Sequence, residues 1–167
     1  MLRPATDHDV PAMLRWRNHP AVRAASFTTH EIGEAEHARW WAGLRGDPAR
    51  LVLIYRHRGE TDAGVVTFSG LTPGATSAEW GYYIDLAGLE RAGETLRAWG
   101  GVERCAIAYA FGPLGLTTLR GQVLASNEPV RLLHRRFGFA EVGTHRREVG
   151  GALVDVVTVE LTGKGDR

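Results

Sequence analysis

Apolar residues recur along the first fifty positions with the spacing of two amphipathic helices. Residues 1–3 are predicted to form a short strand, and Thr6 or Asp7 can cap the helix that follows. The apolar side of that helix consists of Val10, Met13 and Leu14. After Pro20 a loop is expected through residues 27–29. A second helix is predicted over residues 33–44, with His37, Trp41 and Leu44 on one face.

The middle of the chain changes to the pattern of strands. Residues 51–58 and 65–71 are rich in β-branched and apolar side chains, and the glycine-containing segment 59–64 separates them as a turn. After a Thr-Pro-Gly turn at residues 72–74, residues 78–84 form the next strand. We therefore expect three consecutive antiparallel strands.

The last third alternates between helices and strands. The pattern predicts a helix over residues 102–111, a strand over 119–125 and a helix over 128–137, in which Val130, Leu133 and Phe137 point inward. Residues 140–148 and 153–161 form a hairpin around Gly150 and Gly151. Segment 86–101, rich in glycine and alanine, fits neither pattern. The order predicts an α+β domain with a central sheet of about seven strands and four helices.

The composition excludes some classes of protein but does not identify a function. The 167 residues contain 44% apolar and 23% charged side chains, as in ordinary globular domains, and suffice for one core. We expect a single domain over residues 1–162 and a short tail over 163–167. The net charge of +1 argues against a nucleic-acid-binding protein. No signal peptide and no apolar run of about 20 residues is found, so we expect a cytoplasmic protein without membrane association.

Cysteine and histidine offer little chemistry of their own. Cys105 is the only cysteine, which excludes an intrachain disulfide and fits a reducing compartment. The seven histidines contain no His-x-x-x-His pair, and we expect no metal site. Ser126 and Cys105 lack a convincing partner for nucleophilic catalysis.

Residues 119–139, which read LRGQVLASNEPVRLLHRRFGF, carry the strongest motif. They describe a strand that ends at Asn127, a helix entered through Pro129, and a Gly-Phe turn into another strand. Together with Tyr82-Tyr83-Ile84-Asp85, this segment resembles the C-terminal half of the acetyl-CoA-dependent N-acetyltransferases of the GNAT superfamily. The resemblance extends over essentially the full chain. It implies a mixed, mostly antiparallel sheet that opens as a V between strands 4 and 5, where a β-bulge separates them, and acetyl-CoA as co-substrate.

The resemblance assigns the coenzyme contacts. The pantetheine arm would add like a strand between the ends of the two splayed strands, where Tyr82, Tyr83, Ile84 and Asn127 lie. Main-chain groups of that strand would also stabilise the thioester oxyanion. Each has a simpler reading, because Tyr82–Ile84 can be core strand and Asn127 can be a helix N-cap.

The pyrophosphate of the coenzyme needs a glycine-rich helix N-terminus, where backbone N–H groups face the anion. The family pattern places such a loop before the helix that follows the fourth strand. Arg97, Gly100, Gly101 and Val102 stand in that place, although Val102 departs from the Gly or Ala of the family. Residues 91–94 are a second candidate for the same loop.

The position at which the family usually has the acidic tyrosine is occupied by His134 in this chain. A histidine can protonate the departing thiolate near neutral pH. The sequence places His134 at the edge of the buried face of its helix, where a purely structural histidine is the alternative. Glu79, on the strand that enters the site, is the candidate general base, and water is the alternative.

The N-terminal half resembles a subgroup that acetylates a nucleotide-linked amino sugar in pseudaminic acid biosynthesis. The resemblance rests on residues 16–23, 26–32 and 37–41. It implies that an acceptor with a nucleotide diphosphate is bound by arginine, asparagine, histidine and aromatic side chains. The implied acceptor contacts are Arg17, Asn18, Arg23, Phe27, His30 and Trp41.

The sequence therefore predicts an N-acetyltransferase for a small-molecule amine, with a nucleotide-linked amino sugar as acceptor and direct transfer in a ternary complex. Two alternatives stay open. One is acetylation of a protein amino terminus, as by the ribosomal-protein acetyltransferases, which an acidic groove would favour. The other is a domain without catalysis that binds acyl-CoA. The sequence leaves open whether the protein forms a homodimer.

Overall fold

The computed structural model describes residues 1–163 of the chain. Residues 164–167 of the predicted tail lie outside the described part. The elements in chain order are β1 (Leu2–Pro4), the 3-10 turn η1 (Asp7–Asp9), α1 (Val10–Arg17), α2 (Pro20–Ala24), α3 (Glu34–Leu44), β2 (Arg50–His57), β3 (Thr61–Ser69), β4 (Ser77–Ile84), α4 (Leu86–Arg91), α5 (Thr95–Phe111), β5 (Thr118–Leu124), α6 (Glu128–Arg136), β6 (Ala140–Val149) and β7 (Ala152–Thr162).

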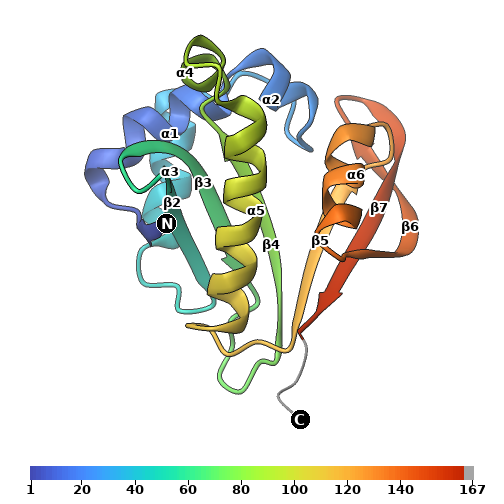
Figure 1. Ribbon diagram of the computed structural model, residues 1–167. Coiled ribbons are helices and arrows are strands. Elements are labelled where there is room, and N and C mark those ends of the chain that lie inside the picture. The colour runs from blue at the N-terminus through green and yellow to red at the C-terminus, as the bar shows by residue number, and fades with distance from the viewer. Residues whose placement is uncertain (164–167) are drawn as a thin grey trace.

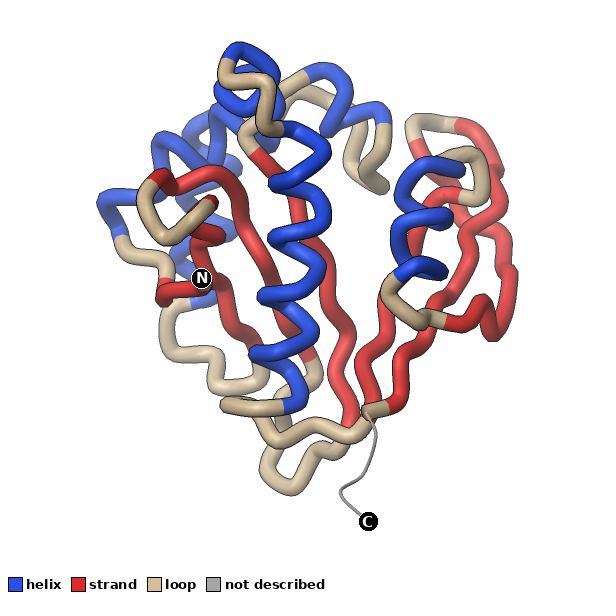
Figure 2. The backbone as a smooth tube through the Cα atoms, viewed as in Figure 1, coloured by secondary structure: helices blue, strands red, loops and turns tan. Residues whose placement is uncertain are grey.

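Seven strands form one sheet in the order β1-β2-β3-β4-β5-β7-β6. Neighbouring strands are antiparallel except β4 and β5, which are parallel. The sheet divides between these two strands into an N-terminal arm and a C-terminal arm that lean apart (Figures 1 and 2). The predicted α+β fold, with a splay between the fourth and fifth strands, is confirmed.

Helices cover both faces of the N-terminal arm, because alternate residues of its strands point to opposite sides. Leu53, Val66 and Phe68 pack toward α5, which lies across one face of β2–β4 (Figure 1). Ile54 and Val65 point the other way and contact the apolar side of α1. On the C-terminal arm, α6 lies over the β5–β7 face (Figure 1). None of the helices within residues 1–163 has the length and apolar character needed to cross a bilayer.

The main correction concerns α5, which begins at Thr95 and not at residue 102. Gly93, at φ +68°, ends the preceding turn, and the amide of Ala98 donates to the Glu94 carbonyl at 2.9 Å. The consecutive glycines at 100 and 101 suggested a loop, but both are helical. Gly101 is required by packing, because a Cβ there would overlap the hydroxyl of Tyr55.

The structure has six α-helices within the described residues, where the sequence predicted four. The two unpredicted helices are short: α2 lies in the predicted loop after Pro20, and α4 lies in segment 86–101. Strand β3 starts at Thr61, so Gly64 is a strand residue and not part of a turn. The β6–β7 hairpin turns at Gly150 and Gly151 as predicted, and both have positive φ.

Gly100 and Gly101 form a matched pair for testing the helical start. Gly100→Ala should stabilise the fold by about 0.5–1 kcal/mol, because alanine favours the helix and open space surrounds its Cβ. Gly101→Ala should destabilise it by about 1–3 kcal/mol through the clash with Tyr55, whose hydroxyl is hydrogen-bonded to His57. Urea unfolding measures both. Equal effects of the two substitutions would contradict the helical placement.

Candidate active site

The central cavity of the protein lies where β4 and β5 separate. Their parallel pairing runs only from Ser77 with Thr118 to Trp80 with Gly121. Beyond this point residues 81–84 pair only with β3, and residues 122–124 pair only with β7. The two facing edges line a cavity of about 620 Å³. Unpaired main-chain N–H and C=O groups of a separated strand can bind an extended ligand arm.

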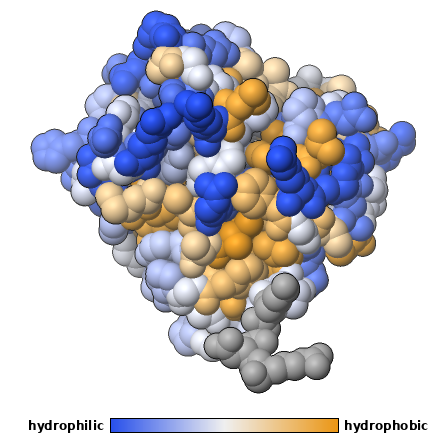
Figure 3. Space-filling model, in the orientation of Figure 1, coloured by the Kyte–Doolittle hydropathy of each residue, from blue (hydrophilic) through white to orange (hydrophobic). Residues whose placement is uncertain are grey.

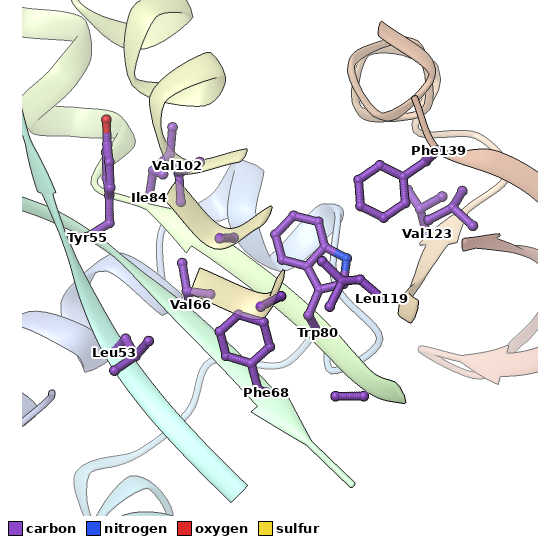
Figure 4. Close-up of a cluster of buried hydrophobic side chains, with 14 of the residues drawn as sticks. Leu53, Tyr55, Val66, Phe68, Trp80, Ile84, Val102, Leu119, Val123 and Phe139 are labelled. Atoms are coloured by element: carbon purple, nitrogen blue, oxygen red, sulfur yellow. The ribbon is translucent and has the colours of Figure 1, made fainter. Parts of the chain in front are cut away.

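Aromatic side chains occupy the base of the V. The Trp80 ring stacks on Tyr82 and on Phe139, with ring centroids 5.4 and 5.7 Å apart, and meets the His134 ring edge-on at 5.7 Å. Figure 4 shows Trp80 from β4 pointing toward Phe139, across the gap between the arms. The prediction of a β-bulge at the gap was wrong: β3 and β4 stay in register from Ser69 with Glu79 to Gly64 with Ile84, and β5 and β7 stay in register to Leu124 with Val156. The stacked rings and the helices hold the arms apart.

His134 is the buried residue of α6, with 5% of its surface exposed, and it lines the cavity. The sequence placed it at the edge of the buried face and pointed Val130, Leu133 and Phe137 inward, but these three are only half-buried. The imidazole can be buried because Glu103 of α5 is its partner. Their Nδ1 and Oε1 atoms are 2.6 Å apart, and the Glu103 side chain is fully buried.

Tyr82 belongs to the same buried group. Burial, and then the charge of Glu103, raise the pKa of the Tyr82 hydroxyl well above its usual value. The Tyr82 hydroxyl and Oε2 of Glu103 have no hydrogen-bond partner within the described residues. Tyr82 therefore stays protonated near neutral pH, and its hydroxyl is a donor beside the carboxylate.

The structure brings the predicted pantetheine residues together. Tyr82, Tyr83, Ile84 and Asn127 all line the cavity. The Tyr83 side chain turns to the opposite sheet face, where it packs against α1 residues, and burial raises its pKa. Asn127 precedes α6 and makes no side-chain cap hydrogen bond, which leaves its amide free for the cavity.

The first candidate pyrophosphate segment does not form a loop. Gly100, Gly101 and Val102 lie inside α5, Val102 is fully buried, and none of the three lines the cavity. Arg97 is exposed and ion-paired with Glu94 at 3.1 Å. The glycine that does precede the helix N-terminus is Gly93, in the second candidate segment 91–94.

Glu94 occupies the N-cap position of α5 and is held from the side of β2. His57 and Arg58 contact its carboxylate at 3.0 and 2.9 Å. The hydrogen bond from His57, followed by those from Arg58 and Arg97, lowers the pKa of Glu94 to about 2. The first-turn amides of α5 have no partner within their own helix, as at any helix start.

The candidate base, Glu79, is not at the cavity. It is exposed on β4 opposite Ser69 of β3 and Arg120 of β5, in the part of the V that is still closed. Of the described residues that line the cavity, none is Asp, Glu, Lys or Cys, and His134 is the one histidine. No cluster of metal-binding side chains occurs within residues 1–163.

Two of the six predicted acceptor residues line the cavity, Arg17 and Phe27. The Nη2 atom of Arg17 donates to the Thr28 carbonyl at 3.0 Å, whereas Nη1 is buried without a partner in the described structure. Phe27 packs on the C-terminal arm and carries the Arg147 guanidinium 4.3 Å above its ring. Arg147, which the sequence analysis did not select, also lines the cavity.

The other four lie elsewhere. The Asn18 amide binds both main-chain groups of Ile32 at 2.8 Å and so clamps a loop. His30 is exposed and pairs with Glu36, and Arg23 is half-buried outside the cavity lining. Trp41 donates to Asp7 at 2.7 Å and lines a second cavity of about 410 Å³ beside α3.

Glu103 is the main residue that sequence reasoning missed. A signal existed: the buried positions of α5 are Ala98, Val102, Glu103, Ala106 and Ala110, and Glu103 is the charged residue on that apolar face. A carboxylate in such a place requires a partner. The partner is 31 residues away on another helix, which explains why no local pattern revealed it.

Comparison with known proteins identifies the family of this fold. A family model described as an acetyltransferase (GNAT) domain matches residues 1–140. A search of curated proteins found no match.

Two solved structures share the fold. Spermidine N-acetyltransferase from Vibrio cholerae, in complex with CoA and spermine, is 21% identical and covers 97% of this chain and 94% of its own, with a TM-score of 0.78. RimJ from Mycobacterium smegmatis, in complex with CoA-disulfide, is 22% identical to this chain. The match covers 96% of this chain and 80% of RimJ, with a TM-score of 0.79.

The two hydrogen bonds of Asn18 predict that this residue stabilises the loop that contains Ile32. Asn18→Ala should destabilise the protein by about 1–3 kcal/mol, because it leaves both main-chain groups of Ile32 unpaired. His30→Ala, which removes an exposed ion pair, should cost less than about 1 kcal/mol. Thermal or urea unfolding distinguishes them. Similar small effects from both substitutions would argue against the clamp.

Proposed function

Because the chain belongs to the acetyltransferase (GNAT) domain family and is an acetyl-CoA-dependent N-acetyltransferase, we propose that its acceptor is an anionic primary amine, specifically a nucleotide-linked amino sugar. One observation carries the proposal. His134 lines the cavity together with Arg17 and Arg147, which both contact the segment Phe27–Thr28, and none of the described lining residues is a carboxylate.

Acetyl-CoA would enter the V between the arms. The pantetheine arm would run along residues 82–84 of β4 and bind main-chain groups that β5 leaves unpaired. The thioester would lie near His134, and a β4 amide would stabilise the oxyanion. We propose the N-terminus of α5, after Gly93, as the pyrophosphate site, because Leu86 and Trp99 on either side of this helix start line the cavity.

The positive charge on the proposed acceptor side of the cavity favours anionic amines over polycationic ones. Arg17 presents a buried Nη1 donor without a partner in the described structure, and Arg147 adds a second guanidinium across the rim. Burial lowers the pKa of Arg17, yet guanidinium groups stay charged in proteins. Two arginines suit the phosphates of a nucleotide sugar, with a bidentate geometry that a lysine lacks. They would repel a polycation such as spermine.

The side of the cavity that receives the acceptor has apolar as well as charged contacts. Phe27 lies beside both arginines, and its ring can pack against a sugar or base face. Figure 3 shows further apolar surface in the middle and lower part of the face on which α5 and α6 lie. An amphipathic acceptor of this kind fits better than a purely polar one.

The direct test combines coenzyme binding with product formation. Calorimetric titration with acetyl-CoA is followed by a panel of UDP-, dTDP- and CMP-linked amino sugars, with thiol release as the readout. We expect coenzyme binding and thiol release with one of these sugars. Release with spermidine or with a peptide amino terminus, and none with the sugars, would overturn the proposed acceptor.

Arg146 and Arg147 are adjacent on β6 and provide a matched pair. Arg147 lines the cavity, whereas Arg146 faces Asp155 of β7 at 3.5 Å. Arg147→Gln should raise the KM of the anionic acceptor by roughly 10-fold or more, the effect of losing one charge-assisted hydrogen bond. Arg146→Gln should leave it unchanged. Equal KM values for both variants would remove Arg147 from the acceptor site.

His134→Gln tests the proposed acid. Turnover should fall by roughly 100-fold or more, as expected for the loss of a general acid, while the Kd of acetyl-CoA stays within about twofold. A stopped assay measures kcat, and calorimetry separately measures the Kd of acetyl-CoA. Unchanged turnover would exclude His134 from the chemistry.

A further inference from the structure

Glu103 lies in the middle of α5 with no exposed surface. Its neighbours on the same face are small and apolar, and they include Ala106 and Val102. A charged carboxylate in such surroundings is strongly disfavoured unless hydrogen bonds and an opposite charge compensate it. Replacement by an apolar residue would be the simpler way to fill the space. The burial of Glu103 therefore points to a role beyond packing.

Its contacts are directed at one ring nitrogen. Oε1 of Glu103 is 2.6 Å from Nδ1 of His134, and Oε2 lies in the same buried pocket as the Tyr82 hydroxyl. An ionised carboxylate only accepts hydrogen bonds, so Nδ1 of His134 carries a proton in this contact. Because Nδ1 is turned to Glu103 and the ring lines the cavity, Nε2 is the nitrogen left for a ligand.

We propose that Glu103 is a positioning residue that makes His134 both the base and the acid of acetyl transfer. This inference rests on the proposed function and extends it from one proton transfer to two. Glu103 fixes the neutral ring with its proton on Nδ1, and Nε2 first accepts and then donates. The dyad replaces the separate base that Glu79 was expected to supply.

In acetyl transfer, His134 carries one proton from the acceptor nitrogen to the sulfur of CoA. The acceptor nitrogen bonds to the thioester carbon as the carbonyl electrons move to oxygen, and the N–H proton passes to Nε2 of His134. The oxyanion then re-forms the carbonyl, the carbon–sulfur bond breaks, and its electron pair goes to sulfur. The Nε2 proton moves to that sulfur. The products are the amide and the thiol of CoA, with His134 returned to its starting form.

No other side chain on the cavity wall can take the first proton. The described lining contains two arginines, which stay charged, and two tyrosines, whose pKa values are raised by burial. Glu103 itself is fully buried and is not among the residues that line the cavity. The imidazolium formed in the middle of the reaction is stabilised by the carboxylate on its far side, as in other carboxylate–histidine pairs.

The groups that face His134 define its electrostatic surroundings. Glu103 approaches from α5 and Tyr82 from β4, while the adjacent Trp80 and Phe139 rings carry no charge. On its own helix, Arg135 is paired with Glu141 at 3.0 Å and Arg136 is exposed. Glu103 is thus the one negative charge in contact with the ring within the described residues.

The first experiment requires no acceptor. Histidine-ring NMR spectra of wild type and Glu103→Gln are followed against pH, and the His134 signals are assigned by their loss in His134→Gln. We expect the wild-type ring to carry its proton on Nδ1. In Glu103→Gln the ring should gain its second proton at a lower pH than in wild type, because the neighbouring negative charge is gone. Identical titrations would overturn the pairing.

The second experiment measures the pH profile of turnover. In Glu103→Gln, kcat on the plateau should fall by roughly 10- to 100-fold, since the intermediate imidazolium loses its stabilising charge. The acidic limb should move to lower pH by the same amount as the NMR titration. Glu60→Gln, an exposed carboxylate of the β2–β3 turn, is the control and should match wild type. A fall in kcat without movement of the limb would contradict the shuttle.

A double mutant separates positioning from structure. Because Glu103 acts through His134, adding Glu103→Gln to His134→Gln should lower kcat no further, whereas a purely structural role would lower it again. If Glu103→Gln fails to fold, Glu103→Asp keeps the charge but withdraws it by one methylene. It should lower kcat and keep the NMR titration near wild type, and unchanged kcat would overturn the role of the contact. The NMR result stands even if every acceptor fails.

Discussion

The end of the parallel pairing between β4 and β5 is the constraint on which the rest of the structure depends. After Trp80 and Gly121 the two strands share no ladder hydrogen bonds, and each stays paired only to its own arm. The stacked rings of Trp80, Tyr82 and Phe139 lie at the base of the opening and connect the two arms. The separation creates the cavity, exposes main-chain groups of β4 to it, and places α5 and α6 on opposite walls.

The two walls meet at one buried polar contact, between Glu103 of α5 and His134 of α6. In a sheet opening lined by aromatic rings, an uncompensated carboxylate or imidazolium would be costly. The contact between them compensates the burial of both polar groups, and it orients the ring so that one nitrogen is left for the cavity. The same contact links the helices of the two arms. The proposed chemistry and the packing across the V therefore involve the same pair.

The charged side chains of the cavity and its wall lie in two separate regions. The dyad lies at its inner wall, whereas Arg17 and Arg147 lie toward the segment that contains Phe27. That segment belongs to the N-terminal half in sequence but packs against Leu124, Val149 and Val156 of the C-terminal arm. It bridges the mouth of the V and brings arginines from distant parts of the chain to one surface. The proposed acceptor contacts therefore belong to a different part of the chain from the Glu103–His134 pair.

The sequence by itself determined the strands and the β6–β7 hairpin, because strand periodicity is written in neighbouring residues, and the family resemblance supplied the splay. Residues 82–84, Asn127 and His134, which the same motif selected, line the cavity. The sequence misplaced the start of α5, because Gly101 looked like a helix breaker until the Tyr55 ring beside it was known. It assigned Trp41 and Asn18 to the acceptor, whereas packing uses them elsewhere. Only the tertiary structure decided that Glu103 meets His134 and that Arg147 reaches the cavity, since both contacts join elements far apart in the chain.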